Sequence, residues 1–585
     1  MSRTVVAALI AAFAVLWLVP SPYYERLNNP NENVRVYLTR AIVEHQTLAI
    51  DDIIDEWGNV DDKAQFEGRM YPGKAPGLSL LAVPIYAAYH AACEKMEYEP
   101  SRREIVYVCR LGTVVLPCLF FLWWFVRFTA RLTDDIGSRL LCIVAVGGAS
   151  TMLVYGMIFT SHTLMSWCVM GAYMAGVAYR DDRHPSWVKA AWLAFVVGHL
   201  LGWAVSLEYP GFLGAAVVGL HAIYRSENKL AFMGWSAAGA AVSIGILMAY
   251  HHFAFGGIFQ TAYQHLENPQ YAEYVSGGFF GMKRISTEAL WGSFFAPSNG
   301  LFWFMPWTLL AVVALPALIR NRSTRDEAIM VAVILVLYTL FISMVRDWRG
   351  GWTAGPRYIV PVVPFLGLLL LRVDEALSRT GSAVLYRTLI VASLGLGSFA
   401  CGLSAAMYPH YPSVLDNPVF ELGVRFVAAG YWPHTSLAGV GLSGSMALLI
   451  VAIAHVVLLG LVAVHTRETN ELSRGAILVG ALAACLVATS AASRVATDTP
   501  ALRRTMQTVH AAWEPAQNSV EQRLRVGQVP TVAQGENPNP LVLRAAARQA
   551  ANAGYSDTAF VWILRALDQA HIDARATRRT TAIDP

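Results

Sequence analysis

The sequence contains few charged residues and few cysteines for its length. Lys, Arg, Asp and Glu together make up 14% of the 585 residues, whereas 55% are hydrophobic. Soluble globular domains carry about 25% charged residues, so this composition excludes an ordinary soluble protein. The net charge of +4 is small and scattered along the chain, so nothing suggests nucleic acid as a partner.

The seven cysteines form no CxxC pair and therefore indicate neither a metal site nor a disulfide framework. Only Cys93 lies outside the predicted membrane spans. We interpret the cysteines as small buried apolar residues. Six lie inside predicted spans: Cys109, Cys118, Cys142, Cys168, Cys401 and Cys485.

Uncharged apolar runs recur from end to end, and each matches the ~20 residues that a helix needs to cross a bilayer. Barrel strands would instead alternate in segments of ~10 residues, so we predict an all-α polytopic membrane protein. Residues 4–19 follow Arg3 as in a secretory signal, but in VPSPYY proline comes right after the only plausible cleavage site and no A-x-A occurs there, so we expect an uncleaved first span. The thirteen predicted spans are 4–20, 103–126, 139–157, 162–179, 188–206, 209–224, 230–250, 300–319, 327–345, 358–371, 386–407, 440–464 and 475–496.

The segment 78–92 is apolar but short, and it contains Pro84 and His90. It could be a fourteenth span or a helix in the membrane interface. If it does not cross, the arginine-rich loops all fall on one side, which the positive-inside rule assigns to the cytoplasm. We therefore predict a cytoplasmic N-terminus, an extracytoplasmic C-terminus and large outer loops, namely 21–102, 251–299 and 408–439.

The C-terminal region is more polar than the rest of the chain. We divide the protein into a transmembrane module, residues 1–497, and an extracytoplasmic tail, residues 498–585. Beyond the linker at 535–541 the tail has helical periodicity with a central Gly-Tyr-Ser-Asp break. One helical hairpin resembling a tetratricopeptide unit fits this pattern, and so does an ordinary amphipathic hairpin.

Basic residues in the outer loops are unusual, because the positive-inside rule disfavours them there. Arg346, Arg349 and Arg357 occur with Trp352 in RDWRGGWTAGPRY, and Lys74 lies between two Gly-Pro turns in GRMYPGKAPGLSL. No carboxylate follows Lys74 closely, so we expect it to be unpaired. Arginine and lysine are the side chains that grip phosphate, so these residues predict an anion site. The alternative for each arginine is snorkelling to lipid headgroups.

Further ionisable residues lie at the outer ends of spans. Glu208 occurs in SLEYPG and His162 in TSHTL, and groups at that depth are costly enough to suggest function, although each could be a hydrogen-bonded structural group. His251 and His252 precede an aromatic and polar stretch that includes Tyr263, which is typical of a sugar pocket. A divalent metal could bind these histidines, but no third ligand is apparent, so we assign no metal.

The order of these motifs resembles a known family. A first span, a long outer loop with an acidic motif at its start, the element Tyr71-Pro-Gly-Lys74-Ala-Pro near the loop's end, and thirteen spans resemble the polyprenyl-phosphate-dependent glycosyltransferases of the GT-C fold. By motif the chain looks most like the lipid A aminoarabinose transferases and the protein O-mannosyltransferases. The resemblance covers roughly residues 1–400.

The resemblance implies an inverting transferase in the bacterial plasma membrane, acting in cell-envelope glycosylation. It would move a sugar from a polyprenyl-phosphate donor to a hydroxyl of a lipid, polysaccharide or protein acceptor, surrounded by membrane lipids. The family's lysine is associated with the lipid phosphate, a role that Lys74 would take together with the three arginines. We expect the substrate pocket to include these residues: Tyr71, His162, His251, His252, Tyr263 and Trp352.

The acidic motif departs from the family pattern. The family's loop opens with Asp-Glu, and the aspartate is thought to act at the acceptor, but this chain has Asn31-Glu32. Asparagine cannot take a proton. Glu32, Glu208 or Asp347 could supply the carboxylate, or the chain is catalytically impaired; we favour Glu32.

A transporter or lipid flippase that performs no chemistry is the alternative, and a scaffold that presents the tail to partners is a third hypothesis. A transporter would show inverted repeats or matching broken helices in two halves. We find no internal repeat in the sequence, and the unusual charges cluster at one predicted surface rather than in mid-membrane.

Overall fold

The structure is a computed structural model that describes residues 1–23, 30–181, 186–276, 281–377, 383–411, 413, 415–428, 433–442 and 444–465, with five single positions between 477 and 485. Over these residues the chain is largely helical, and the antiparallel strands β1 (Lys63–Phe66) and β2 (Arg69–Pro72) form the sheet. The predicted span 475–496 lies almost entirely outside the described residues, and the predicted tail 498–585 lies wholly outside them.

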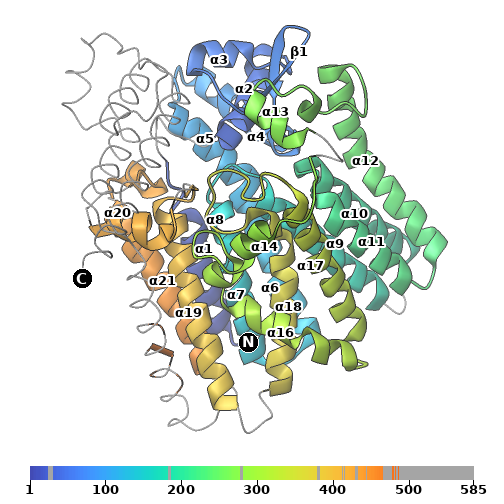
Figure 1. The fold of residues 1–585 in the computed structure, drawn as a ribbon, viewed down its shortest axis with the longest axis vertical. Helices are drawn as coiled ribbons and strands as arrows, with labels where there is room; N and C mark the ends of the chain where they lie inside the picture. The colour runs from blue at the N-terminus through green and yellow to red at the C-terminus, as the bar shows by residue number, and fades with distance from the viewer. Residues whose placement is uncertain are drawn as a thin grey trace, which may run out of the picture.

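Most long helices lie side by side in a bundle, and a cap of shorter elements covers one end of it (Figure 1). The cap contains α2 (Pro30–His45), α3 (Asp51–Trp57), the two strands and α4 (Gly77–Lys95), all within the predicted outer loop 21–102, and α13 (Pro269–Val275) from a later loop. The bundle helices are α1 (Arg3–Leu18), α5 (Arg102–Arg110), α6 (Leu116–Leu132), α7 (Ile136–Gly147), α9 (His162–Asp181), α10 (Trp187–Leu207), α11 (Gly211–Arg225), α12 (Lys229–Phe255), α16 (Trp307–Arg320), α17 (Arg325–Met344), α18 (Val363–Leu377), α19 (Ala383–Met407) and α21 (Gly444–Val464).

Six helical stretches among the described residues are long and apolar enough to cross a membrane. Shorter apolar helices accompany them, including α1, α7, α11 and α16. The prediction of an all-α polytopic membrane protein is therefore confirmed, whereas the count of thirteen spans stays a prediction. The six stretches are 102–132, 187–207, 229–255, 325–344, 384–407 and 444–464.

Two of the predicted spans are broken helices. The span 139–157 divides into α7 and α8 (Thr151–Gly156), and 300–319 divides into α15 (Leu301–Phe304) and α16 at Pro306. Backbone groups freed at such a break must find partners, because lipid supplies none. The indoles of Trp17 and Trp307 donate to the carbonyls of Gly147 and Ala149, at 3.0 and 2.7 Å, which satisfies two of them.

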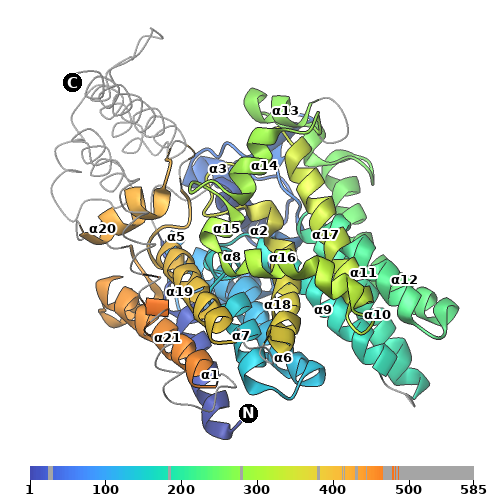
Figure 2. The same cartoon turned by 60° about the horizontal axis from the view of Figure 1, so that its bottom comes forward.

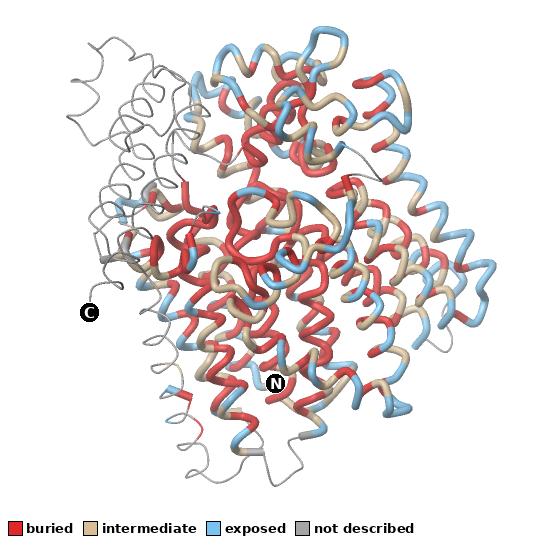
Figure 3. Tube along the Cα trace, in the orientation of Figure 1, coloured by how far each residue is buried: buried red, intermediate tan, exposed pale blue. Residues whose placement is uncertain are grey.

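The first and second large outer loops pack together in the cap. A hydrophobic cluster joins residues of α2 and the hairpin to Tyr250, Ala254 and Phe255 at the end of α12. The shorter elements α14 (Thr287–Phe294) and α15 lead from the second loop back towards the bundle (Figure 2). Burial is greatest in the middle of the bundle and where the cap meets it, which is where the candidate site lies (Figure 3).

Candidate active site

Glu208 lies at the turn that joins α10 to α11. It follows the last residue of α10 with extended backbone angles, and Pro210 precedes the first residue of α11. A Cβ at Gly211 would lie 2.3 Å from the carbonyl oxygen of Ala204, so only glycine allows so tight a turn. The EYPG sequence thus fixes a carboxylate at the end of the bundle that faces the cap.

A buried ion pair connects Glu208 to the first outer loop. Arg35 of α2 donates from Nη2 to Glu208 Oε1 at 2.5 Å, and Ser161 Oγ donates to the same oxygen at 2.9 Å. The other Arg35 nitrogens donate to Asn31 Oδ1 at 3.0 Å and to the carbonyl of Ala75 at 3.1 Å. No described residue donates a hydrogen bond to Glu208 Oε2, so one carboxylate oxygen is available to a ligand.

Arg35, Lys74 and Arg357 are the cations that act electrostatically on this carboxylate. Burial by itself would raise the pKa of Glu208, but Arg35, followed by His162, Lys74 and Arg357, outweighs burial and lowers the pKa to about 2. Glu208 is therefore ionised at neutral pH. Its side chain is 8% exposed, in contrast to the fully buried side chain of Arg35.

Lys74 is not unpaired, so that expectation was wrong. Its ammonium lies 2.9 Å from Asp62 Oδ2, and its side chain is 17% exposed. The hairpin causes this pairing, because β1 and β2 run antiparallel and Gly73 N donates to the carbonyl of Asp62 at 2.8 Å. The partner precedes Lys74 in the chain and is folded back onto it.

The arginine-rich segment forms a second wall of the site. Asp347 Oδ1 accepts hydrogen bonds from Gly350 N and Gly351 N at 3.0 and 3.3 Å, and both glycines have positive φ. A Cβ at Gly350 would lie 2.2 Å from Arg357 Nε, so this glycine lets the arginine lie against the backbone. Asp347 is thus occupied in the turn.

Two of the three predicted arginines have buried donor atoms that are unsatisfied. Arg357 Nε, and Arg349 Nε and Nη2, have no hydrogen-bond partner among the described residues. The amide nitrogen of Asn299, close to Arg349 through Thr353, is also unpartnered. Buried donors without partners are costly and point to an anionic ligand. Arg346 differs, because it is half-exposed and forms an ion pair with Glu273.

Aromatic and imidazole groups flank Glu208. His251 Nδ1 lies 3.2 Å from the carbonyl of Ile258, which can only accept, so Nδ1 carries the proton and Nε2 accepts from Tyr209 OH at 2.9 Å. The Tyr263 ring packs edge-on against Tyr209 at 5.5 Å. His162 is buried with Nε2 unpartnered among the described residues.

The other predicted pocket residues lie in three different places. Tyr71 packs against Phe255 in the hydrophobic cluster of the cap. Trp352 is buried in the arginine-rich segment. His252 is exposed, whereas its neighbour His251 is buried, so the structure does not bring His252 to the site. The histidine pair therefore does not act as a unit.

Glu32 forms a separate and closed cluster. Its Oε1 accepts from Arg110 Nε at 2.5 Å and from Phe159 N at 2.7 Å, and its side chain is 1% exposed. Burial would raise the pKa of Glu32, but Arg110 and then His410 outweigh it and lower the pKa. Oε2 is buried and has no partner among the described residues.

A small polar hollow lies beyond Arg110. It has a volume of about 220 Å³ and is lined by residues of α5 and of the third outer loop, including Arg103, Tyr107 and Thr435. Arg110 immediately precedes a π-helical turn, Leu111–Val115, a distortion frequently found at functional sites. Arg110 therefore separates Glu32 from this hollow.

Sequence reasoning did not identify Arg35, Asp62, Ser161, Tyr209 or Arg110. Arg35 is four residues after Asn31 on one helix, a spacing that places the two side chains on the same face and could have revealed their contact. The contacts of Ser161 and Arg110 join residues that lie far apart in the chain. No local pattern predicts such pairs.

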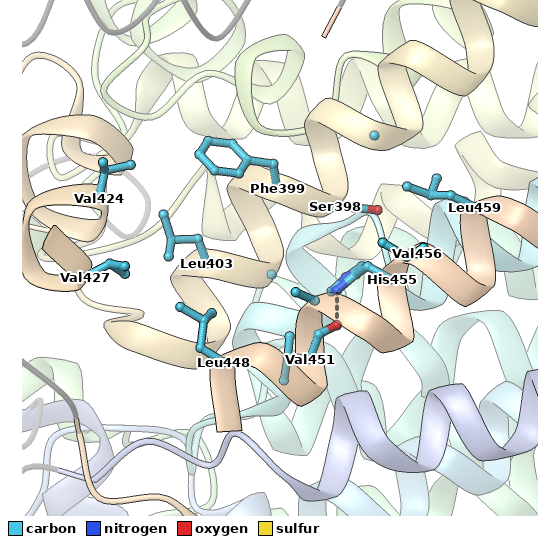
Figure 4. A pocket seen from close by; sticks show the side chains of 13 residues that line it. Ser398, Phe399, Leu403, Val424, Val427, Leu448, Val451, His455, Val456 and Leu459 are labelled. Carbon is cyan, nitrogen blue, oxygen red and sulfur yellow. Dashed lines mark hydrogen bonds between the residues drawn. The ribbon is translucent and has the colours of Figure 1, made fainter. Parts of the chain in front are cut away.

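Groups of three or more His, Cys, Asp or Glu side chains that could hold a metal ion do not occur among the described residues. An apolar groove of about 420 Å³ between α19 and α21 has no charged side chain among its lining residues (Figure 4). His455 in that groove lies within hydrogen-bond distance of the carbonyls of Val451 and Gly148. The groove therefore has no lysine, arginine or carboxylate among its lining residues, and both ring nitrogens of His455 already contact backbone carbonyls.

No family model and no curated protein matches the chain. Among solved structures, it is similar to ArnT from Cupriavidus metallidurans in the apo state, with 18% identity over 84% of this chain and 77% of that chain and a TM-score of 0.44. ArnT from the same organism bound to undecaprenyl phosphate matches with 15% identity over 98% and 79% of the two chains and a TM-score of 0.40.

The archaeal oligosaccharyltransferase AglB from Archaeoglobus fulgidus, in complex with an inhibitory peptide and a dolichol-phosphate, matches with 9% identity over 74% of this chain and 60% of that chain and a TM-score of 0.41. ArnT and AglB are both GT-C fold enzymes, the fold that the sequence motifs resemble. At TM-scores below 0.5 the likeness assigns no residue role and no substrate to this chain.

Proposed function

We propose that the chain is a membrane glycosyltransferase that moves a sugar from a polyprenyl-phosphate donor to an acceptor hydroxyl, outside the plasma membrane and with inversion. One observation supports it most strongly. An ionised carboxylate with one unoccupied oxygen, Glu208, lies among buried cations where the bundle meets the cap. Transfer of a sugar from a phosphate leaving group needs both a base for the acceptor hydroxyl and cations that stabilise the phosphate.

The cations would bind the donor phosphate. Arg357 is the first choice, because it is buried and has an unpartnered Nε. Lys74 would share its ammonium between Asp62 and a phosphate oxygen, so Asp62 would compete with the donor for the lysine. ArnT was solved with undecaprenyl phosphate and AglB with dolichol-phosphate, and we extend this class of lipid to the present chain.

The reaction would be a single displacement. The acceptor hydroxyl oxygen forms a bond to the anomeric carbon, and the bond from that carbon to the phosphate oxygen breaks. Glu208 Oε2 takes the hydroxyl proton, and the polyprenyl phosphate leaves with the bonding electron pair. Arg357 and Lys74 stabilise the negative charge that grows on the leaving phosphate, an effect that is strong where water is scarce. Attack from the opposite face inverts the anomeric centre.

Glu208 is more accessible to an acceptor than Glu32, with side chains 8% and 1% exposed. Glu32 is held by Arg110 and Phe159 N in a closed cluster, and its second oxygen is buried. Asn31, which occupies the position of the family's aspartate, would position Arg35 and through it Glu208. Loss of the family's acid is then compensated by a carboxylate from another loop.

Tyr209, Tyr263 and His251 would line the sugar. Tyr209 directly follows Glu208 in the chain, donates to His251 Nε2 and packs against the Tyr263 ring, so the three rings form one cluster next to Glu208. Aromatic faces and hydroxyls are suited to a sugar, which has both apolar and polar surfaces. Arg349 and Asn299, with their unpartnered donors, would contact an anionic part of the donor or the acceptor.

The test is transfer by the purified protein. It is incubated with a radiolabelled polyprenyl-phosphate sugar and separate lipid, polysaccharide and protein acceptors, and label on the acceptor is measured together with the anomeric configuration of the product. We expect inverted product with wild type and a large loss with Glu208→Gln. Glu94→Gln, at an exposed carboxylate in α4, is the matched control. Movement of labelled lipid across vesicles without any transfer would instead support the flippase.

A further inference from the structure

A groove at the end of the bundle away from the candidate active site has an apolar wall and a cationic rim. It has a volume of about 530 Å³ and lies between α1 and α6, with Arg127 and Arg139 among its lining residues. The apolar lining residues come from the two facing helices and include Leu9, Phe13 and Leu122. Neither arginine contributes to the glycosyl transfer proposed above.

The charges and the apolar wall lie at opposite ends of the groove. Helix α6 runs from Leu116 to Leu132. Leu119 therefore lines the end of the groove near the start of α6, and Arg127 and Ala130 line the end near its C-terminus. The span from Leu119 to Ala130 is about 16 Å at 1.5 Å per residue. One leaflet of the hydrocarbon core is about 15 Å thick, so the groove has the length of one acyl chain.

Neither arginine is bonded to an anionic partner, although the Asp134 carboxylate acts electrostatically on Arg139. Neither Arg127 nor Arg139 forms an ion pair with any described carboxylate, and Arg127 contacts the Trp123 ring at 5.3 Å. Arg139 makes only long hydrogen bonds, at 3.5 Å to Thr129 Oγ1 and 3.4 Å to the carbonyl of Val126. Two unpaired guanidinium groups at the mouth of an apolar groove complement a phosphate on a lipid headgroup.

We infer that this groove, which we term the α1–α6 groove, binds one anionic phospholipid of the leaflet opposite the candidate active site. Its phosphate would lie between Arg127 and Arg139, and one acyl chain would follow the apolar wall towards Phe13. The uncharged groove between α19 and α21 has no comparable cation to select a headgroup (Figure 4). The α1–α6 groove thus adds a lipid site that is independent of the proposed sugar transfer.

Native mass spectrometry of the delipidated protein, titrated with phosphatidylglycerol or with phosphatidylethanolamine, tests the inference. Wild type should retain one phosphatidylglycerol in preference to phosphatidylethanolamine. At about 1 kcal/mol per basic residue, Arg127→Gln with Arg139→Gln should weaken phosphatidylglycerol binding about 30-fold. Arg131→Gln, an exposed arginine on the same helix that does not line the groove, is the matched control and should bind as wild type does.

A second variant keeps the test independent of the arginines. Ala14→Trp fills the groove without changing charge, and it should also abolish retention of phosphatidylglycerol, while glycerol phosphate without acyl chains should not compete in any sample. Equal binding of the two lipids by wild type, or unchanged binding by both the double arginine variant and Ala14→Trp, would overturn the inference. Competition by glycerol phosphate alone would reduce the site to a phosphate site and would overturn the lipid assignment.

Discussion

Replacing Glu208 by glutamine removes one negative charge from the site and keeps its shape. Glutamine retains an acceptor oxygen, so the hydrogen bonds from Arg35 and Ser161, at 2.5 and 2.9 Å in the wild type, can still form. What disappears is the ability of Oε2 to take a proton. General-base assistance is typically worth about 10²–10⁴-fold, so we expect kcat to fall at least 100-fold, or by about 2.7 kcal/mol in the activation barrier.

The same substitution lowers kcat but should not weaken donor binding. Without the carboxylate, Lys74 and Arg357 act on the donor phosphate with less competition, because both cations act electrostatically on Glu208 in the wild type. The donor should therefore bind as tightly as before or more tightly. A fall in kcat without a rise in the donor KM distinguishes a base from a residue that merely shapes the site.

Stability must be measured alongside activity. Arg35 is fully buried, and removal of one partner of a buried ion pair is destabilising by about 3–5 kcal/mol. Because glutamine keeps the acceptor, we expect about 3 kcal/mol or less for Glu208→Gln. Thermal unfolding in detergent should therefore still show a cooperative transition.

The assay is transfer of label from the donor, with initial rates over a range of donor concentrations, for wild type, Glu208→Gln and the control Glu94→Gln. Glu32→Gln is measured in the same series, and we expect it to lose stability through its buried Arg110 partner and to keep turnover in the molecules that remain folded. A folded Glu208→Gln protein with a kcat within about threefold of wild type would refute the reasoning. So would a folded Glu32→Gln protein that turns over at least 100-fold more slowly.

Three further predictions concern the cations and the turn. Lys74→Ala should weaken donor binding about 10–100-fold, as for a lost charge-assisted hydrogen bond, while Asp62→Asn should strengthen binding by freeing the lysine; equal donor affinities for both variants would rule this role out. Arg357→Ala should weaken donor binding more than Arg357→Lys, and lipid binding unchanged in both would leave Arg357 as a headgroup anchor. Gly211→Ala should lower stability by about 1–3 kcal/mol because its Cβ would lie 2.3 Å from the Ala204 carbonyl oxygen, and an unshifted thermal midpoint would contradict this steric account.

The membrane helices were the most predictable part of the chain. Long apolar runs mark them directly, because lipid requires a helix of sufficient length with its backbone satisfied. The breaks between α7 and α8 and between α15 and α16 were not predicted. Local signals were present, namely Gly147-Gly148 and the capping residue Ser150 at the first break and Pro306 at the second, whereas the Trp17 and Trp307 indoles that stabilise the first break come from other helices.

The sequence predicted several residues of the candidate site, but it did not predict which residues pair with one another. Unusual charges at the ends of spans identified Glu208, His162 and Arg357, which the structure brings close together. The partner of Lys74 was missed because a hairpin reverses the chain and returns Asp62 to it. The two-residue turn at Glu67-Gly68, where both residues have positive φ, is a local hairpin signal that the sequence reasoning did not use.

A structure of the protein with a bound polyprenyl-phosphate sugar would test the central claim most directly. The account predicts the donor phosphate in contact with Arg357 and Lys74, and the anomeric carbon facing Glu208 Oε2 across a space that can hold an acceptor hydroxyl. A donor phosphate bound elsewhere, with Glu208 still enclosed by Arg35 and out of reach of the sugar, would contradict it.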